Sequence, residues 1–245
     1  MLLIGGLLTV CNLKAQQIIE SFDNVSTLQS NGWVFDNQSN MPTATTWAQG
    51  DAAAFSAQSG AANSYIVNDT STGVDLVCNW LIMPAIGFID QLSFYTRAQG
   101  LANEVTQMRV MYSPTGSINT GACSNAPKKT SSNSPNGSLD FGDFGTLLTL
   151  NVNQLPGVYP QDWTQFSVNV NGSGRVAFLY FVDTSAPNLN AGTLAIDTIS
   201  ISNSVIIGTP QTVPTLNFIG LMSLLFTILL ISLLNKKYFK MGKTQ

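Results

Sequence analysis

Hydrophobic residues recur along the chain in short runs, and polar turn residues separate these runs at regular intervals. From Phe166 to Val170, for example, hydrophobic residues alternate with Ser167 and Asn169, which is typical of a strand with one buried face. No helical period is sustained, so the pattern predicts a β-sandwich rather than alternating strands and helices. The predicted strands are Ile18–Phe22, Gly32–Phe35, Tyr65–Val67, Trp80–Met83, Leu92–Arg97, Met108–Tyr112, Leu147–Val152, Phe166–Val170, Arg175–Val182 and Leu194–Ile201.

One predicted strand differs from the others because Val176–Val182 is hydrophobic at odd and even positions alike. Such a run predicts a central strand that is covered on both faces. The segments between strands are rich in Gly, Ser, Asn and Pro. The longest, Thr115–Asp143, is predicted to cross one end of the sandwich as a surface excursion.

The N-terminal segment is hydrophobic from Met1 to Val10, which is too short a run to cross a bilayer as a helix. It leads to Leu13, Lys14 and Ala15, after which the sequence becomes polar. This arrangement predicts a secretory signal peptide over residues 1–15, removed after Ala15.

A second hydrophobic run, Phe218–Leu234, lies near the C-terminus and is followed by lysines without any acidic residue. Because the run is apolar on every face, it predicts a transmembrane helix over residues 217–235 rather than a core helix. The excess of lysine places a basic tail, residues 236–245, in the cytoplasm and the rest of the protein outside. Residues 206–216 form the predicted linker to the membrane, and residues 16–205 form the predicted ectodomain.

The composition of the chain excludes several classes of functional site and partner. The chain has no histidine, which removes the commonest general base and zinc ligand. Residues 16–213 carry 5 basic and 13 acidic residues, a net charge of −8, which excludes nucleic acid as a partner. After cleavage of the signal peptide, Cys78 and Cys123 remain. An oxidising compartment favours a disulfide between them, and two unbonded thiols are the alternative.

Several motifs resemble those of choice-of-anchor J domains, which are related to cleaved-adhesin and MAM-like jelly rolls. The N-terminal half contributes Glu20–Asp23, Asn31–Trp33, Trp47, Asn79–Ile86 and Leu92–Arg97, and the C-terminal half contributes Trp163, Arg175–Phe181 and Ile196–Ile201. The resemblance covers about 185 residues, nearly the whole ectodomain. It implies an all-β jelly-roll sandwich with an adhesive or ligand-binding function.

The end of the linker resembles the IPTL-type C-terminal sorting signal of Gram-negative bacteria. The motif consists of Val213, Pro214, Thr215 and Leu216, with Gly220 following before the apolar run and the basic end. Phe218 and Ile219 depart from the usual pattern of that signal. The resemblance implies an envelope sorting protease as a partner. The protein is then held in the inner membrane during sorting and afterwards reaches the cell surface or the extracellular space.

Two carboxylates are predicted to point toward apolar neighbours, where an isolated charge is costly. Strand periodicity puts Glu20 on one face with Ile18 and Phe22, and Asp197 on one face with Ile199 and Ile201. A structural Ca²⁺ shared by Glu20 and Asp197 would satisfy both, and the related jelly rolls imply the same ion. Alternatively, both carboxylates reach solvent at strand ends and bind nothing.

Aromatic side chains are the usual platform for sugars, and Trp33 and Trp47 are the candidate ligand-binding residues because they flank predicted turns. Core packing is the alternative for each. The sequence therefore predicts a non-enzymatic, exported surface protein with an adhesive module for a glycan or matrix ligand. The alternative is a passive structural component of the envelope or extracellular matrix. Binding predicts exposed aromatic residues gathered on one face or loop end, whereas passivity predicts a uniformly polar surface.

Overall fold

The computed structural model of the chain describes residues 16–39, 46–69, 76–100, 103–122, 140–184 and 190–203, together with Met222, Phe226 and Thr227. The chain divides into two compact units, residues 1–205 and 206–245. The first unit contains the β-sandwich that is described below. In the second, the three described residues are helical.

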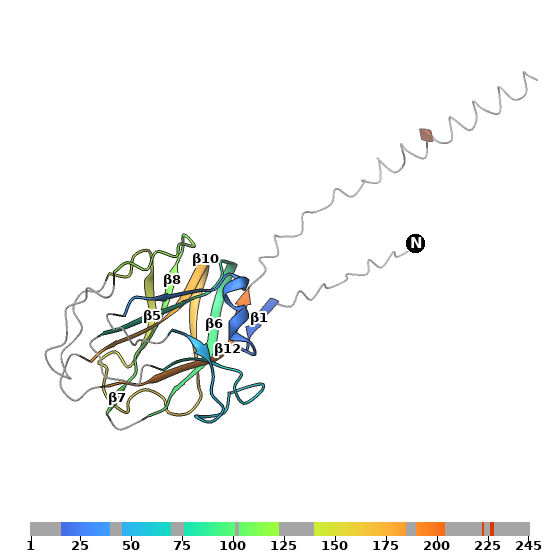
Figure 1. Cartoon of the computed structure of the whole chain (residues 1–245). Helices are drawn as coiled ribbons and strands as arrows, with labels where there is room; N and C mark the ends of the chain where they lie inside the picture. The colour runs from blue at the N-terminus through green and yellow to red at the C-terminus, as the bar shows by residue number, and fades with distance from the viewer. Residues whose placement is uncertain are drawn as a thin grey trace, which may run out of the picture. The chain divides into compact units, whose positions relative to one another are not determined.

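Strands account for nearly all of the regular structure in the described part of the first unit (Figure 1). They are β1 (Gln16–Glu20), β2 (Val34–Asn37), β3 (Ala48–Gln49), β4 (Ile66–Asp69), β5 (Leu76–Ile82), β6 (Ile86–Ala98), β7 (Glu104–Val105), β8 (Met108–Ser113), β9 (Gly145–Leu150), β10 (Thr164–Asp183), β11 (Asn190–Ala191) and β12 (Thr193–Asn203). Two 3-10 turns, η1 (Val25–Thr27) and η2 (Gln29–Asn31), follow β1.

The strands form two antiparallel layers, here called sheet A and sheet B. In sheet A, β6 lies between β12 and the first half of β10, while β1 and β4 pair with different halves of β12, and β3 pairs with β4. In sheet B, the second half of β10 lies between β5 and β8, which pair in turn with β2 and β9. Figure 1 shows β5, β8 and β10 running together. A short parallel pair, β7 and β11, completes the fold.

Strand β10 joins the two sheets. The sequence predicts separate strands at Phe166–Val170 and Arg175–Val182, but the structure contains one strand of 20 residues. Its pairing with β6 shifts register between Asn169 and Gly174, and Gly174 has φ of 150°. A Cβ atom at Gly174 would lie 2.2 Å from the Ser113 carbonyl oxygen, so only glycine fits where the strand turns from one sheet into the other.

The second half of β10 confirms the prediction of a strand covered on both faces, because every residue from Val176 to Val182 is fully buried. Its even-numbered residues pack in the main core between the sheets, with Leu92, Phe94, Ile196 and Ile201. Its odd-numbered residues pack in a second cluster on the other face of sheet B, with Trp80 and Phe144. Burial of each large apolar side chain contributes about 1.5–3 kcal/mol.

The second cluster shows what covers the outer face of sheet B. Phe141 and Phe144, at the end of the predicted excursion Thr115–Asp143 and just beyond it, lie with ring centres 6.0 and 5.2 Å from that of Trp80. The Arg109 guanidinium lies 5.2 Å from the Phe141 ring. This end of the excursion therefore packs on the broad face of a sheet, whereas the sequence predicted a path across one end of the sandwich.

Several predicted segments lie outside the described residues. They include the signal peptide, the sorting motif and nearly all of the predicted transmembrane helix 217–235. In the part of the chain that the structure describes, no helix combines the length and the apolar character that crossing a bilayer requires.

Candidate functional site

The outward face of sheet A is lined by polar side chains. Along β6, buried Leu92, Phe94 and Thr96 point into the sandwich, so Ser93, Tyr95 and Arg97 alternate with them on the outside. All three outward residues are partly exposed. The alternation follows from the two-residue period of a strand, which turns one half of β6 to the core and the other to solvent.

Strand register assembles these outward residues into rows that cross the sheet. One row consists of Asn169, Gln91, Ser202 and Gln17, and the next contains Ser167, Ser93 and Ser200. Cross-strand hydrogen bonds link the rows: the Gln91 amide donates to Asn169 Oδ1 at 3.2 Å, and the Gln17 amide donates to Ser200 Oγ at 2.5 Å. None of these side chains is charged, so the face offers hydroxyl and amide groups that both donate and accept hydrogen bonds.

An aromatic cluster stands at one end of this face. Phe55 stacks on Tyr65 with ring centres 4.9 Å apart, and Trp163 meets both rings edge-on at 5.9 and 5.7 Å. The Arg97 guanidinium carbon lies 4.2 Å from the Phe55 ring centre and 5.9 Å from that of Trp163. Tyr65 is buried, whereas Phe55, Trp163 and Arg97 remain partly exposed. We call these four residues the aromatic–arginine cluster.

Tyr65, the buried member of the cluster, is held by hydrogen bonds to the Asp51 backbone and by close contact with Gly50. The Tyr65 hydroxyl donates to the Asp51 carbonyl at 2.8 Å and accepts from the Asp51 N–H at 3.0 Å. A Cβ atom at Gly50 would lie 2.4 Å from the Tyr65 ring, so this position admits no side chain. Burial raises the pKa of Tyr65, opposed by its hydrogen bond to Asp51, so the hydroxyl stays protonated as a donor.

The loop formed by residues 51–64 brings Phe55 to the cluster and is tied down at two points. At one, the Trp163 indole N–H donates to the Ser56 carbonyl at 2.8 Å. At the other, Asp197 Oδ2 accepts the N–H groups of Gln58 and Ser59 at 2.8 and 3.1 Å. Asp197 Oδ1 also accepts the Thr198 N–H at 2.6 Å. Asp197 is therefore a buried anchor for the loop.

The pKa of Asp197 is raised, and the cause is desolvation. The N–H groups of Ser59, Gln58 and Thr198 oppose this effect because they favour the charged carboxylate. The loop therefore supplies the hydrogen bonds that an otherwise costly buried charge requires.

The described arginines differ in how their guanidinium groups are used. Arg175 donates to the carbonyls of Gly116 and Met83 at 2.8 and 2.9 Å. Arg109 donates to Gln107, and burial lowers its pKa. Arg97 makes a single long bond, from Nε to the Ala98 carbonyl at 3.5 Å. Among the described residues, its terminal nitrogens have no hydrogen-bond partner, so they are open to an external acceptor.

The two predicted ligand-binding tryptophans both lie in the main core. Trp47 is 2% exposed. Trp33 is 6% exposed and lines a mostly apolar pocket of about 220 Å³ together with Glu20. The rest of the lining consists of Met83, Pro84, Ile86, Ile199 and Ile201. Both tryptophans therefore pack in the core, which was the alternative in the sequence analysis, and neither belongs to the aromatic–arginine cluster.

The predicted calcium pair is not brought together. Glu20 pairs with Ile199, whose side chain packs in the core, so Glu20 faces inward. Asp197 pairs with outward-facing Tyr95. The expectation that Asp197 shares a face with Ile199 and Ile201 is wrong, because the register shifts after Asp197 and Thr198 has φ of 47°.

Each of the two carboxylates also has its own backbone N–H donors, which agrees with their positions on opposite faces of the sheet. Glu20 Oε1 accepts the Phe22 N–H at 2.8 Å, and both oxygens of Asp197 accept N–H groups. Over the described ranges, no three acidic, histidine or cysteine residues lie together in a group that could hold a metal ion. The described residues therefore do not fit a cation shared by Glu20 and Asp197.

Cys78 is buried and disulfide-bonded. Cys123 lies outside the described residues, as do Val213–Leu216 and Gly220. The pairing of Cys78 with Cys123 and the role of the sorting motif therefore stay predictions.

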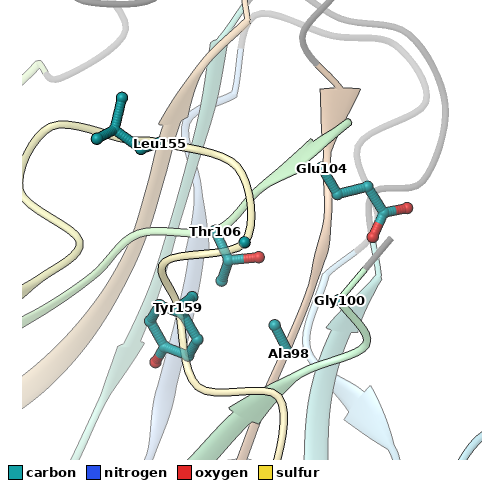
Figure 2. Close-up of a pocket in the computed structure, with 7 residues that line it drawn as sticks. Ala98, Gly100, Glu104, Thr106, Leu155 and Tyr159 are labelled. Carbon is teal, nitrogen blue, oxygen red and sulfur yellow. The ribbon is translucent and has the colours of Figure 1, made fainter. Parts of the chain in front are cut away.

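A cavity near β7 is too small to be a ligand site. Figure 2 shows Glu104, Thr106, Leu155 and Tyr159 around it, and its volume is about 10 Å³. That volume holds one water molecule and no sugar ring.

Sequence reasoning missed the aromatic–arginine cluster. One signal was available: Trp163 has the same parity as Ser167 and Asn169 on the outward face of the predicted strand, and Arg97 ends another strand. What the sequence did not reveal is that β6 and β10 are neighbours and that the loop carrying Phe55 crosses beside them.

No family model matches the sequence, and no curated protein matches it. Solved structures do match. The K1 cleaved adhesin domain of Lys-gingipain from Porphyromonas gingivalis W83 has a TM-score of 0.51 at 20% identity, over 77% of this chain and 99% of that domain.

Two further domains of the same protein are also similar. The K2 domain has a TM-score of 0.52 at 14% identity, over 77% of this chain and 100% of that domain. The K3 domain has a TM-score of 0.47 at 16% identity, over 76% of this chain and 98% of that domain. The likenesses to the K1 and K2 domains show the fold, which is an all-β sandwich similar to the cleaved adhesin domains.

Proposed function

We propose that the protein is an exported surface protein whose β-sandwich binds a glycan through the outward face of sheet A. The observation that carries this proposal is the aromatic–arginine cluster at the end of a face lined with Ser, Asn and Gln. Pyranose rings present C–H groups that pack on aromatic rings, and hydroxyls that exchange hydrogen bonds with amides and hydroxyls.

The arrangement of the polar rows favours a chain-like ligand. One row crosses the four neighbouring strands β10, β6, β12 and β1, the next crosses β10, β6 and β12, and neither contains a charged side chain. A glycan chain lying across these rows would end against Phe55, Trp163 and Arg97. The loop 51–64, tied to Asp197 and Trp163, is held in place before binding, which lowers the entropic cost of association.

The surface location remains part of the proposal. It is supported by the predicted signal peptide, the apolar run Phe218–Leu234 with its lysine-rich tail, and the disulfide bond at Cys78. We propose that the apolar run anchors the protein in the inner membrane and that a sorting protease acts near Val213–Leu216. The exposed domain would then act as a non-enzymatic adhesive module.

A passive structural role is the competing function. It predicts polar rows alone, whereas the structure adds partly exposed aromatic rings and an arginine at one end of them. That addition favours binding.

A glycan array with the full-length protein tests the proposal. We expect the wild type to bind a subset of polysaccharides and the Tyr95→Ala variant to bind them more weakly, because Tyr95 lies in the middle of the face. The control is Leu147→Ala, which removes an exposed apolar side chain from β9 of sheet B. A wild type that binds nothing would favour the passive role.

A further inference from the structure

Three backbone carbonyl oxygens converge on the side-chain amide of Gln49. Its Nε2 lies 2.8 Å from the Phe22 oxygen, 2.6 Å from the Asn63 oxygen and 3.4 Å from the Tyr65 oxygen. The carbonyls come from the turn after β1 and from the end of the loop 51–64 with the residue that follows it. We call this arrangement the carbonyl cradle.

The orientation of the amide is fixed by its other end. Gln49 Oε1 accepts the Val25 N–H at 2.9 Å, at the start of η1. The opposite orientation would place the N–H₂ group against the Val25 N–H and the oxygen against three carbonyls. The N–H₂ group must therefore face the carbonyl cradle, where its two hydrogens are shared among three acceptors.

Such a cradle has the character of a cation site. Hard cations such as Ca²⁺ are bound by carbonyl and carboxylate oxygens. Two of the three oxygens also accept a backbone N–H: that of Asn63 accepts from Tyr65 and that of Tyr65 accepts from Gly50, each at 2.8 Å. An amide N–H₂ group supplies partial positive charge without an ion.

The backbone at Phe22 is bent to supply one of the carbonyls. Phe22 has φ of 54°, an unfavourable region for a bulky residue, and its side chain is fully buried. Its N–H donates to Glu20 Oε1 at 2.8 Å while its carbonyl accepts from Gln49. The N–H group and the carbonyl group of Phe22 therefore both take part in holding the turn.

We propose that Gln49 takes the place of a bound cation, so that the joint between β1, η1 and the loop 51–64 holds without a metal. This proposal runs against the calcium expectation from the sequence. It also stands apart from glycan binding, because it concerns the stability of the joint. Replacement of the Gln49 amide by a carboxylate should turn the carbonyl cradle into a Ca²⁺ site formed by that carboxylate and the backbone oxygens.

Thermal unfolding of the full-length protein in EDTA and in millimolar Ca²⁺ tests the proposal. The wild type should melt at the same temperature in both. Gln49→Glu should melt about 5 °C lower in EDTA, because a carboxylate oxygen then faces three carbonyls, and should recover in Ca²⁺ but not in NaCl of equal ionic strength. A wild type that loses stability in EDTA and regains it in Ca²⁺ would overturn the proposal.

A second variant covers the case in which Gln49→Glu does not fold. Gln49→Ala removes the amide without adding charge, and we expect it to melt about 5 °C below the wild type in EDTA. Ala48→Ser, at the exposed neighbouring position of β3, is the control and should melt like the wild type. If Gln49→Ala also melts like the wild type, the amide does not hold the joint and the proposal fails.

Discussion

The guanidinium carbon of Arg97 lies 4.2 Å from the centre of the Phe55 ring, although 42 positions separate the two residues in the sequence. Arg97 comes from β6 and Phe55 from the loop that crosses beside it, so the contact exists only in the folded sandwich. A cation over a partly exposed ring contributes about 0.5–1 kcal/mol, which suits a surface that must stay open to a ligand.

Phe55→Ala should weaken glycan binding about tenfold, a loss of about 1.4 kcal/mol, because the variant removes one ring of the cluster. Its effect on stability should stay within about 1.5 kcal/mol, since Phe55 is partly exposed. Equilibrium titration with a polysaccharide that the wild type binds on the array measures the first effect, and a urea melt measures the second. An affinity equal to that of the wild type would remove Phe55 from the site.

Asp197→Ala should loosen the loop 51–64, because the N–H groups of Gln58 and Ser59 lose their acceptor. We expect a loss of about 2–4 kcal/mol in the free energy of unfolding. Hydrogen exchange should also accelerate at residues 58 and 59. Asp162→Ala is the matched control, since Asp162 is an exposed carboxylate beside Trp163. Unchanged exchange at residues 58 and 59 in Asp197→Ala would contradict the anchoring role.

The raised pKa of Asp197 predicts the sign of a pH effect. Its ordinary value is 3.8, and burial raises the pKa in the folded protein. Between these two values the folded state binds the proton and the unfolded state does not, so stability from this group is lost as pH rises through the folded pKa. The wild type should therefore gain stability relative to Asp197→Asn as pH falls from 7 toward 4. Melting temperatures of both proteins across this range measure the difference, and a constant difference would contradict the prediction.

The cysteine pairing can be tested by peptide mapping without reduction. We expect a linked pair of peptides that contain Cys78 and Cys123. Cys78→Ser should lower the free energy of unfolding by about 2–4 kcal/mol, because the reduced chain has a more flexible unfolded state. A Cys78 peptide linked to any other cysteine would refute the pairing.

Periodicity in the sequence predicted the positions of most strands because each strand must bury one face, and the fully buried run Val176–Val182 was predicted for the same reason. Local sequence could not reveal that β10 passes from one sheet to the other, since the bend depends on the close approach of Gly174 to Ser113.

The candidate site was less predictable than the fold. The bulge at Thr198 reversed the face assigned to Asp197, because one residue in a left-handed conformation shifts the two-residue period. The aromatic–arginine cluster depends on which strands are neighbours and on the path of one loop, and neither is encoded in the spacing of residues.

Tryptophan oxidation by N-bromosuccinimide gives the most direct test of the proposed glycan face. Trp33, Trp47 and Trp80 are at most 6% exposed, whereas Trp163 is partly exposed. Peptide mapping of the wild type should therefore find Trp163 oxidised first. A saturating amount of a polysaccharide that binds on the array should protect Trp163 and leave Trp33 unchanged. Oxidation of Trp163 at the same rate with the glycan bound, or protection of Trp33 in its place, would contradict binding at the outward face of sheet A.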